Sequence, residues 1–330
     1  MIPPPSARPG TTGRHDVRLR EIAPRLTFQA HPVPTELKIE LVQRLVRAGI
    51  RDFELSSFVR PDLVPGLADA AEVFGAVRGP GLTLGCCIGN ERGLRAAAAA
   101  GADSATFLLS ADEDFARANI GRSTTESLDE LERLAGVATD LGIALGTYVI
   151  FAWGGPTGPA RGPAELEPIA RRLVDIGVTD WVLADSSGYA APPQIRDLLD
   201  VAAHHLPLEA LTVQVHDNRG LGVANVLALA ELGVGTIDVS LAGSGGHPAM
   251  PGQRGGGVCT EDAAQALELA GHDTGLDLAA LVDTANWLAD AGVSGLGFVR
   301  HVGPVPRSAQ APAALTFAWK NPTQESEPAQ

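Results

Sequence analysis

Lysine is nearly absent from this chain of 330 residues, and its scarcity excludes one class of mechanism. Only Lys38 and Lys320 contribute lysine to the 25 basic residues. Lys38 opens a predicted helix and Lys320 lies in the C-terminal tail, so neither is expected at the end of a strand. Covalent catalysis through a lysine amine is therefore not expected.

Cysteine is also scarce, with Cys86, Cys87 and Cys259 the three in the chain. Cys86 and Cys87 are adjacent within an apolar run, which is neither a disulfide framework nor a zinc ribbon. Cys259 precedes a predicted helix, where the pKa of a thiol can fall, but packing is the commoner role for such residues. Unpaired thiols are typical of a reducing compartment, and we expect a cytoplasmic protein.

No uninterrupted apolar stretch reaches the roughly 18 residues that a membrane span needs, so none is expected. Residues 1–15 contain prolines and glycines but no apolar core of a signal peptide, and we interpret them as a flexible arm. The formal net charge is -14 at pH 7. Because an acidic surface repels phosphate backbones, nucleic acid is not an expected partner.

Strand-like apolar runs alternate with segments of helical periodicity over most of the chain. The eight predicted strands are 17–22, 52–55, 82–87, 104–109, 144–151, 180–184, 211–216 and 236–240. The clearest predicted helices are 35–49, 125–142, 163–177, 192–204, 221–233 and 260–271. This order predicts an α/β fold, a (β/α)8 TIM barrel.

An open doubly wound sheet is the alternative fold, but no G-x-G-x-x-G turn follows Ile22, which disfavours it. A further helical stretch at 277–292 extends the barrel domain, which we place at 16–302. The tail, 303–330, is rich in Pro, Ala, Gln and Ser and is expected to be flexible.

Barrels of this kind carry their active sites at the C-terminal ends of the strands, so polar residues there are candidates. Arg25 follows the first strand, and a guanidinium fixed there suits a carboxylate or an enolate oxygen. Arg25 is expected between Glu21 and Glu54, where it would offset the cost of burying a carboxylate. The alternative is a structural ion-pair network.

Three later strand ends carry further candidates. Asp185 is either a general acid/base or the cap of the following turn. His216 is a candidate acid/base, while Asp217 beside it is expected to orient a loop. His247 lies in the glycine-rich stretch 243–257, which is either a lid over the site or merely flexible.

These motifs, in this order, resemble the 3-hydroxy-3-methylglutaryl-CoA (HMG-CoA) lyase family of metal-dependent TIM barrels. The family's opening E-x-x-x-R-D-G-x-Q is similar to Glu21–Gln29, and its E-T-T-S-F-V-S-P to Glu54–Pro61. The other matching segments are Gly89–Gly93, Asn119–Ile120, Ala184–Gly188, Ser240–Pro248 and Thr260–Asp262. The resemblance covers about residues 17–299.

The resemblance also implies a divalent-cation site, and this chain departs from it at most ligand positions. Leu26 stands where the family has Asp, and Gln214 where it has the first of two His. His216 keeps the second His, and Gly256 or Gly257 takes the place of Asn. The family's loop cysteine is replaced by His247. We therefore expect no resident divalent metal, since Mg²⁺ or Mn²⁺ needs several oxygen ligands.

By this resemblance the chain is expected to be a carbon–carbon lyase or condensing enzyme acting on a small carboxylated acyl thioester, with acyl-CoA one candidate, or on a keto acid. Arg25 would polarise the carbonyl, Asp185 and His216 would move protons, and His247 would enter when the loop closes. The predicted substrate-binding residues are Gln29, Glu54, Ser57, Asn90, Asn119 and Gln214. Replacing Arg25 by Met should abolish turnover with little change in melting.

Two other functions stay open at this point. One is a non-catalytic barrel that binds a ligand or a protein partner. The other is a metalloenzyme with relocated ligands from His216, His247 and Glu54, a set better suited to zinc or iron. The family often forms dimers, so a homodimer is one expectation.

Overall fold

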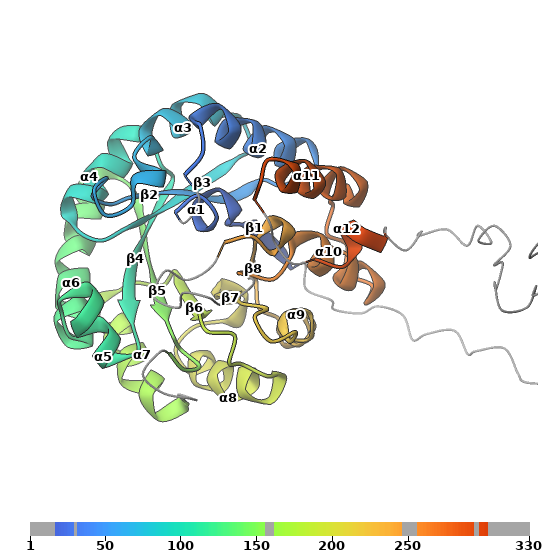
Figure 1. Ribbon diagram of the computed structural model, residues 1–330. Coiled ribbons are helices and arrows are strands. Elements are labelled where there is room, and N and C mark those ends of the chain that lie inside the picture. The colour runs from blue at the N-terminus through green and yellow to red at the C-terminus, as the bar shows by residue number, and fades with distance from the viewer. Residues whose placement is uncertain (1–16, 30–31, 156–161, 246–255, 294–296, 303–330) are drawn as a thin grey trace, which may run out of the picture.

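The computed structural model describes residues 17–29, 32–155, 162–245, 256–293 and 297–302. Within them, eight parallel strands close into a barrel in chain order, with β1 beside both β2 and β8. The helices surround this barrel, as Figure 1 shows. The strands are β1 (Arg18–Glu21), β2 (Asp52–Phe58), β3 (Thr83–Ile88), β4 (Ser104–Ser110), β5 (Ala144–Ile150), β6 (Trp181–Asp185), β7 (Thr212–Val215) and β8 (Thr236–Val239). The predicted TIM barrel is confirmed.

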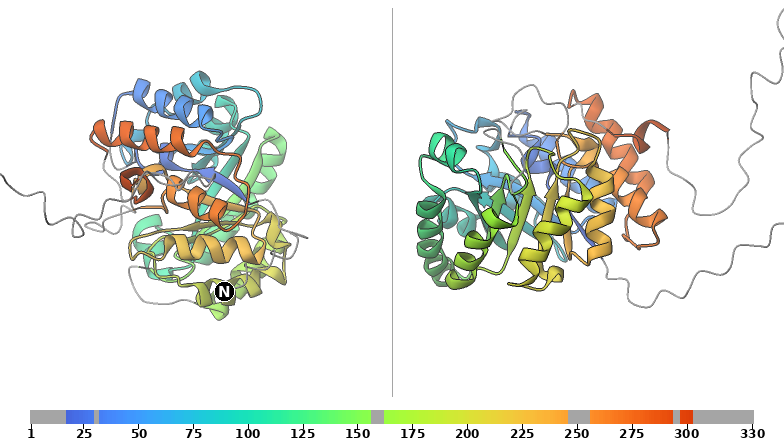
Figure 2. Two further views of the ribbon diagram at one scale, coloured as in Figure 1. Left: turned by 90° about the vertical axis from the view of Figure 1, so that its right-hand side faces the viewer. Right: turned by 90° about the horizontal axis from the view of Figure 1, so that it is seen from below.

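The outer layer is helical, and α11 lies beside α2 where the two ends of the barrel domain meet (Figure 2). The main helices are α2 (Thr35–Arg47), α3 (Ala70–Val77), α4 (Glu91–Ala100), α6 (Thr124–Leu141), α7 (Pro163–Ile176), α8 (Pro192–Ala203), α9 (Gly222–Leu232), α10 (Thr260–Leu269) and α11 (Leu278–Asp290). Shorter pieces are α1 (Ala23–Leu26), α5 (Glu113–Phe115), α12 (Val299–Val302), η1 (Pro65–Leu67), the π-helical η2 (Ala116–Ile120), η3 (Leu208–Ala210) and η4 (Leu241–Gly243).

Local sequence explains where these helices begin and end. The Ser123 hydroxyl accepts from Glu126 N at 3.0 Å, and the Glu126 carboxylate accepts from Ser123 N at 2.7 Å, which is a capping box before α6. The same helix ends at Gly142, whose φ of 66° suits a residue without a Cβ. Such signals place predicted and observed boundaries within one or two residues of each other.

Strand β2 differs from its prediction in a way that matters for the site. The predicted strand ended at Leu55, but β2 continues to Phe58, with an irregular register between Glu54 and Ser56. Glu54 therefore lies inside the strand rather than at its end. Its carboxylate sits within the barrel, where the side chain is 1% exposed.

Apolar side chains form two clusters. The larger fills the space between the strands and the surrounding helices. The smaller lies inside the barrel and contains Phe115, Tyr148, Ile150 and Phe151, with Leu108 packed against it. No helix in the described ranges is long and apolar enough to cross a membrane. The predicted arm and tail, 1–15 and 303–330, lie outside the described residues.

Candidate active site

The mouth of the barrel holds a cavity of about 520 Å³ between the strand ends. Its lining includes Arg25, Gln29, Gln214 and His216, four of the residues that the sequence predicted for a site. They come from α1, the turn after it and the end of β7. The strand-end rule therefore brings these four together, as expected for a TIM barrel.

Arg25 is held in place by Glu54. Its Nε donates to Glu54 Oε1 at 2.6 Å, and its Nη2 contacts the same oxygen. Burial alone would raise the pKa of Glu54, but Arg25, followed by Arg20, brings it below its usual value. Burial opposes the charge on Arg25 as well, yet Glu54 raises the pKa of Arg25 well above its usual range. Both groups are therefore ionised, and Glu54 positions Arg25 rather than lining the cavity itself.

Glu21 does not share this ion pair, which corrects the expectation that Arg25 lies between two glutamates. Glu21 instead accepts from Ala23 N at 2.9 Å, from Leu241 N at 3.0 Å and from the Thr260 hydroxyl at 2.6 Å. Burial raises the pKa of Glu21 to about 7 even though these donors oppose the shift. Glu21 thus ties β1 to the segment that follows β8, which is a structural role.

A second network of charged side chains lies inside the barrel, and it was not predicted from the sequence. Arg20 donates to both oxygens of Asp238, at 2.7 and 2.9 Å, and the Tyr148 hydroxyl donates to Asp238 Oδ2 at 2.7 Å. The Arg25 guanidinium carbon is 5.8 Å from the centre of the Tyr148 ring. Tyr148 lines the cavity, so this network fixes part of its floor. The available signal was a charged residue inside each of two buried strands, β1 and β8.

Asp185 is buried at the end of β6, and its carboxylate is occupied by the backbone. Its two oxygens accept from Tyr189 N at 2.8 Å and Ala190 N at 3.0 Å. Burial raises the pKa of Asp185 to about 6 against the effect of these donors. Among the described residues, Ser186 rather than Asp185 lines the mouth cavity. Similarly, Asp217 accepts from Gly222 N at 2.7 Å, consistent with its expected role in a loop.

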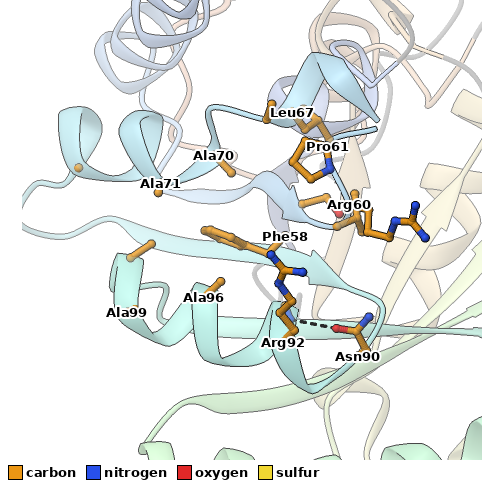
Figure 3. Close-up of a pocket in the computed structure, with 16 residues that line it drawn as sticks. Phe58, Arg60, Pro61, Leu67, Ala70, Ala71, Asn90, Arg92, Ala96 and Ala99 are labelled. Atoms are coloured by element: carbon orange, nitrogen blue, oxygen red, sulfur yellow. Dashed lines mark hydrogen bonds between the residues drawn. The ribbon is translucent and has the colours of Figure 1, made fainter. Parts of the chain in front are cut away.

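Ser57 and Asn90 do not join the mouth cavity. They line a separate cavity of about 670 Å³ between α3 and α4, outside the barrel, which Figure 3 shows with Phe58 and Arg92. The Asn90 side chain accepts from Gly93 N at 3.1 Å and so caps α4. Asn119 lies within η2, and its side chain is outside the described residues, as are His247 and the surrounding segment 246–255.

The thiols and Lys38 match their expected structural roles. Cys86, Cys87 and Cys259 are all buried, and burial raises the pKa of each above its usual value. The Lys38 ammonium donates to Gly66 O at 2.6 Å and to Asp69 at 2.7 Å, between α2 and the segment before α3. Neither a reactive thiolate nor a catalytic amine is formed by these groups.

Comparisons with known proteins identify the family of this chain. The HMGL-like family model matches residues 16–288. The mitochondrial hydroxymethylglutaryl-CoA lyase of Bos taurus is 34% identical over 278 residues, which is 83% of this chain and 85% of that protein. This chain belongs to the HMGL-like family. The resemblance predicted from the sequence is therefore confirmed.

Solved structures of HMGL-like enzymes superpose closely. The HMG-CoA lyase of Bacillus subtilis has a TM-score of 0.82 at 30% identity and covers 87% of this chain and 98% of its own. The Acinetobacter baumannii enzyme, solved with coenzyme A and 3-methylmalate, has a TM-score of 0.84 at 29% identity, with 90% and 100% covered. The carboxyl transferase domain of Rhizobium etli pyruvate carboxylase, 18% identical with a TM-score of 0.65, shares the fold alone.

The divalent cation implied by the HMGL-like family does not fit the residues present at its ligand positions. Leu26 is 2% exposed, and a Cβ on Gly257 would lie 3.7 Å from Leu26 Cδ2, so an apolar side chain packs there. Gln214 and His216 offer one amide and one imidazole, without a carboxylate. Such a set is poor for Mg²⁺ or Mn²⁺, which prefer several hard oxygen ligands.

The rebuilt site of His216, His247 and Glu54, which the sequence left open, includes one residue that the structure does not describe. The Glu54 carboxylate is already paired with Arg25, and His247 lies outside the described ranges. No cluster of three or more His, Cys, Asp or Glu side chains with metal-binding geometry occurs in the described part of the chain.

Proposed function

We propose that this protein is a carbon–carbon lyase, or the reverse condensing enzyme, that acts on a carboxylated 3-hydroxyacyl thioester and uses its own side chains in place of the family's cation. One observation carries the proposal: Arg25, Gln214 and His216 line the same cavity at the barrel mouth, and Arg25 is fixed by a buried carboxylate. The family relatives, named as HMG-CoA lyases, support the reaction class.

In the cleavage direction, His216 takes the proton of the substrate's C3 hydroxyl. The electron pair left on that oxygen forms the new C3 carbonyl, the C2–C3 bond breaks, and its electron pair moves through C2 onto the thioester oxygen. The resulting enolate oxygen faces the Arg25 guanidinium, whose fixed positive charge stabilises it. Returning the proton from His216 to C2 completes a shorter acyl thioester and a free carbonyl compound.

Gln214 assists at the same oxygen. Its Nε2 lies 3.4 Å from His216 Nε2, so the amide is held next to the group that moves the proton. An amide N–H aimed at a developing oxyanion supplies part of the stabilisation that a Lewis acid gives elsewhere. Asp185, predicted as a second acid/base, is assigned instead to holding the turn after β6, because both of its oxygens accept backbone N–H groups.

Turnover of HMG-CoA and related 3-hydroxyacyl-CoA esters tests this proposal, with the thioester and carbonyl products followed by mass spectrometry. Parallel reactions contain EDTA, Mg²⁺ or Mn²⁺. The His216→Gln variant should lose about 10²–10⁴-fold in kcat, the usual range for a positioned acid/base. The control is His204→Gln, which changes an exposed histidine at the end of α8. Tight binding of these esters without product under every condition would favour a non-catalytic barrel instead.

A further inference from the structure

One wall of the mouth cavity is made of apolar side chains. Leu108 comes from β4, Ile150 from the end of β5, Phe115 from α5 and Ile120 from the end of η2. These elements follow one another along the barrel, since β4 and β5 are paired neighbours. Phe115 and Ile150 belong to one apolar cluster against which Leu108 packs, and Ile120 lines the same cavity.

This wall is backed by rigid packing. Phe115 meets Phe151 edge to face, with ring centroids 4.7 Å apart, and both belong with Ile150 to the cluster inside the barrel. Phe151 adopts a φ of 58°, which a non-glycine residue keeps only where its surroundings hold it. The wall therefore presents a preformed apolar surface that does not need to rearrange before it binds a ligand.

The polar residues on which the proposed reaction depends come from other elements of the mouth. Arg25 follows β1, which is four strands away from β5 in the closed order and so lies across the barrel from it. Gln214 and His216 belong to β7 and the residue after it. Among the described residues that line the cavity, Arg25 is the single permanent cation, and none is a carboxylate.

Apolar side chains also form the rim of the cavity beside β2, the neighbour of β1. Leu63, in the connection after β2, lines the cavity and is 69% exposed, so a large apolar side chain stands at its rim. Val59 and Val64 from the same connection also line it. A second charged group placed against such surfaces would lose its hydration without gaining a partner, which is strongly unfavourable.

We infer that the substrate carries on C3 an apolar chain larger than a methyl group, which packs on the wall formed by Leu108, Phe115, Ile120 and Ile150. This inference rests on the proposed function and names its substrate class: a carboxylated 3-hydroxyacyl thioester with an alkyl or aryl substituent. A single methyl group is too small to cover four such side chains. The wall instead matches a chain of several carbons, while Arg25, Gln214 and His216 meet the reacting polar end.

A homologous series tests the inference. The probes are 3-hydroxy-3-alkylglutaryl-CoA esters with alkyl groups from methyl to pentyl. Because each buried methylene is worth about 0.8 kcal/mol, kcat/KM should rise about fourfold per added carbon until the wall is covered. The non-cleavable 3-alkylglutaryl-CoA esters, which lack the hydroxyl, should show the same trend in Kd by calorimetry.

Two matched variants distinguish an effect of this wall on substrate preference from a general loss of protein stability. Leu108→Ser replaces a half-buried residue of the wall and should flatten the dependence of kcat/KM on chain length. Val137→Ser makes the same kind of change at a half-buried position of α6, away from the cavity, and should leave the slope unchanged. A loss of folded protein lowers all values together but does not alter the slope.

The two proposals fail in different ways. The apolar-chain inference would be overturned if both kcat/KM and binding affinity stayed equal or fell as the alkyl group grew beyond methyl. The lyase proposal would remain intact. Chain-length-dependent Kd values without any turnover would support the apolar wall and count against the lyase. A slope that Leu108→Ser and Val137→Ser change equally would also overturn the inference, because the wall would then not be its source.

Discussion

Gln214 and His216 are two residues apart on and just after β7, and their Nε2 atoms lie 3.4 Å apart at the barrel mouth. Alternate residues of a strand point to the same side, which explains why both reach the cavity. By its resemblance to the HMG-CoA lyases, the sequence would be expected to have two histidines at these positions. Here an amide and an imidazole lie within hydrogen-bonding distance of each other instead. We therefore expect hydrogen bonds, rather than a bound cation, to stabilise charge on the substrate at this position.

Replacing Arg25 by Met should lower kcat by about 10²–10³-fold, the usual loss for one oxyanion donor. Contrary to the expectation from sequence alone, its melting curve should also change. The variant leaves the buried Glu54 carboxylate without its partner, which typically costs about 3–5 kcal/mol. Denaturant unfolding and steady-state kinetics of the same samples check both effects.

The double variant Arg25→Met with Glu54→Gln is the matched control for that prediction. It removes the uncompensated charge, so most of the lost stability should return while turnover stays low. If the single variant melted like the parent, the Arg25–Glu54 ion pair would not have the structural role assigned to it. If the double variant recovered activity, Arg25 would not be the oxyanion partner.

Restoring the family's ligand types should restore cation binding. The triple variant Leu26→Asp, Gln214→His and Gly257→Asn should bind Mn²⁺ at least tenfold more tightly than the parent, because it supplies a carboxylate, a second imidazole and an amide oxygen. A Cβ at position 257 would lie at an ordinary contact distance of 3.7 Å from Leu26 Cδ2, whereas Ser240 Cβ, at 3.1 Å, must shift slightly to admit it. Mn²⁺ titration followed by electron paramagnetic resonance measures the change.

The matched control replaces Leu26 by Asn instead of Asp in the same background. It has a similar shape but no negative charge, so it should bind Mn²⁺ less tightly than the Asp version. Equal affinity of the parent and the triple variant for Mn²⁺ would show that residues other than these positions govern metal binding.

Asp185→Asn should reduce kcat/KM by less than about tenfold and keep the shape of its pH profile. Asn still offers one acceptor to the turn, whereas Asp185→Ala leaves both N–H groups of Tyr189 and Ala190 unpaired, at about 1–3 kcal/mol each. The alanine variant should therefore be the less stable of the two. The pKa of Asp185 is about 6. If the pH profile of the asparagine variant lost a limb near pH 6, Asp185 would instead be established as an acid/base.

The fold and part of the candidate site could be predicted from the sequence because they depend on local patterns. Strand and helix periodicity fixed the barrel, and the strand-end rule found Arg25 and His216. Glu54 was misplaced because β2 runs on past an irregular register, which no local pattern signals. The Arg20–Asp238–Tyr148 network was missed because it joins β1, β5 and β8, whose contact depends on closure of the barrel. The apolar wall was missed for the same reason.

Glu21 should make the stability of this protein fall as pH rises. Its pKa is raised by burial from 4.5 to about 7, so the folded state binds the proton more tightly than the unfolded chain. The contribution to the free energy of unfolding is therefore greatest below about pH 4.5 and is lost as pH rises through about 7. Between pH 5 and 8 this amounts to about 2–3 kcal/mol. Burial raises the pKa of Glu261 to about 8, which acts in the same direction.

The Glu21→Gln variant isolates this effect, because Gln is uncharged and can still accept from Ala23 N and Leu241 N. Relative to the parent, it should become more stable by about 2–3 kcal/mol as pH rises from 5 to 8, measured by denaturant unfolding. The control Glu36→Gln changes an exposed residue of α2 and should keep a constant difference from the parent. If both variants kept a constant difference, the Glu21 carboxyl would titrate alike in the folded and unfolded chains, and burial would not be what raises its pKa.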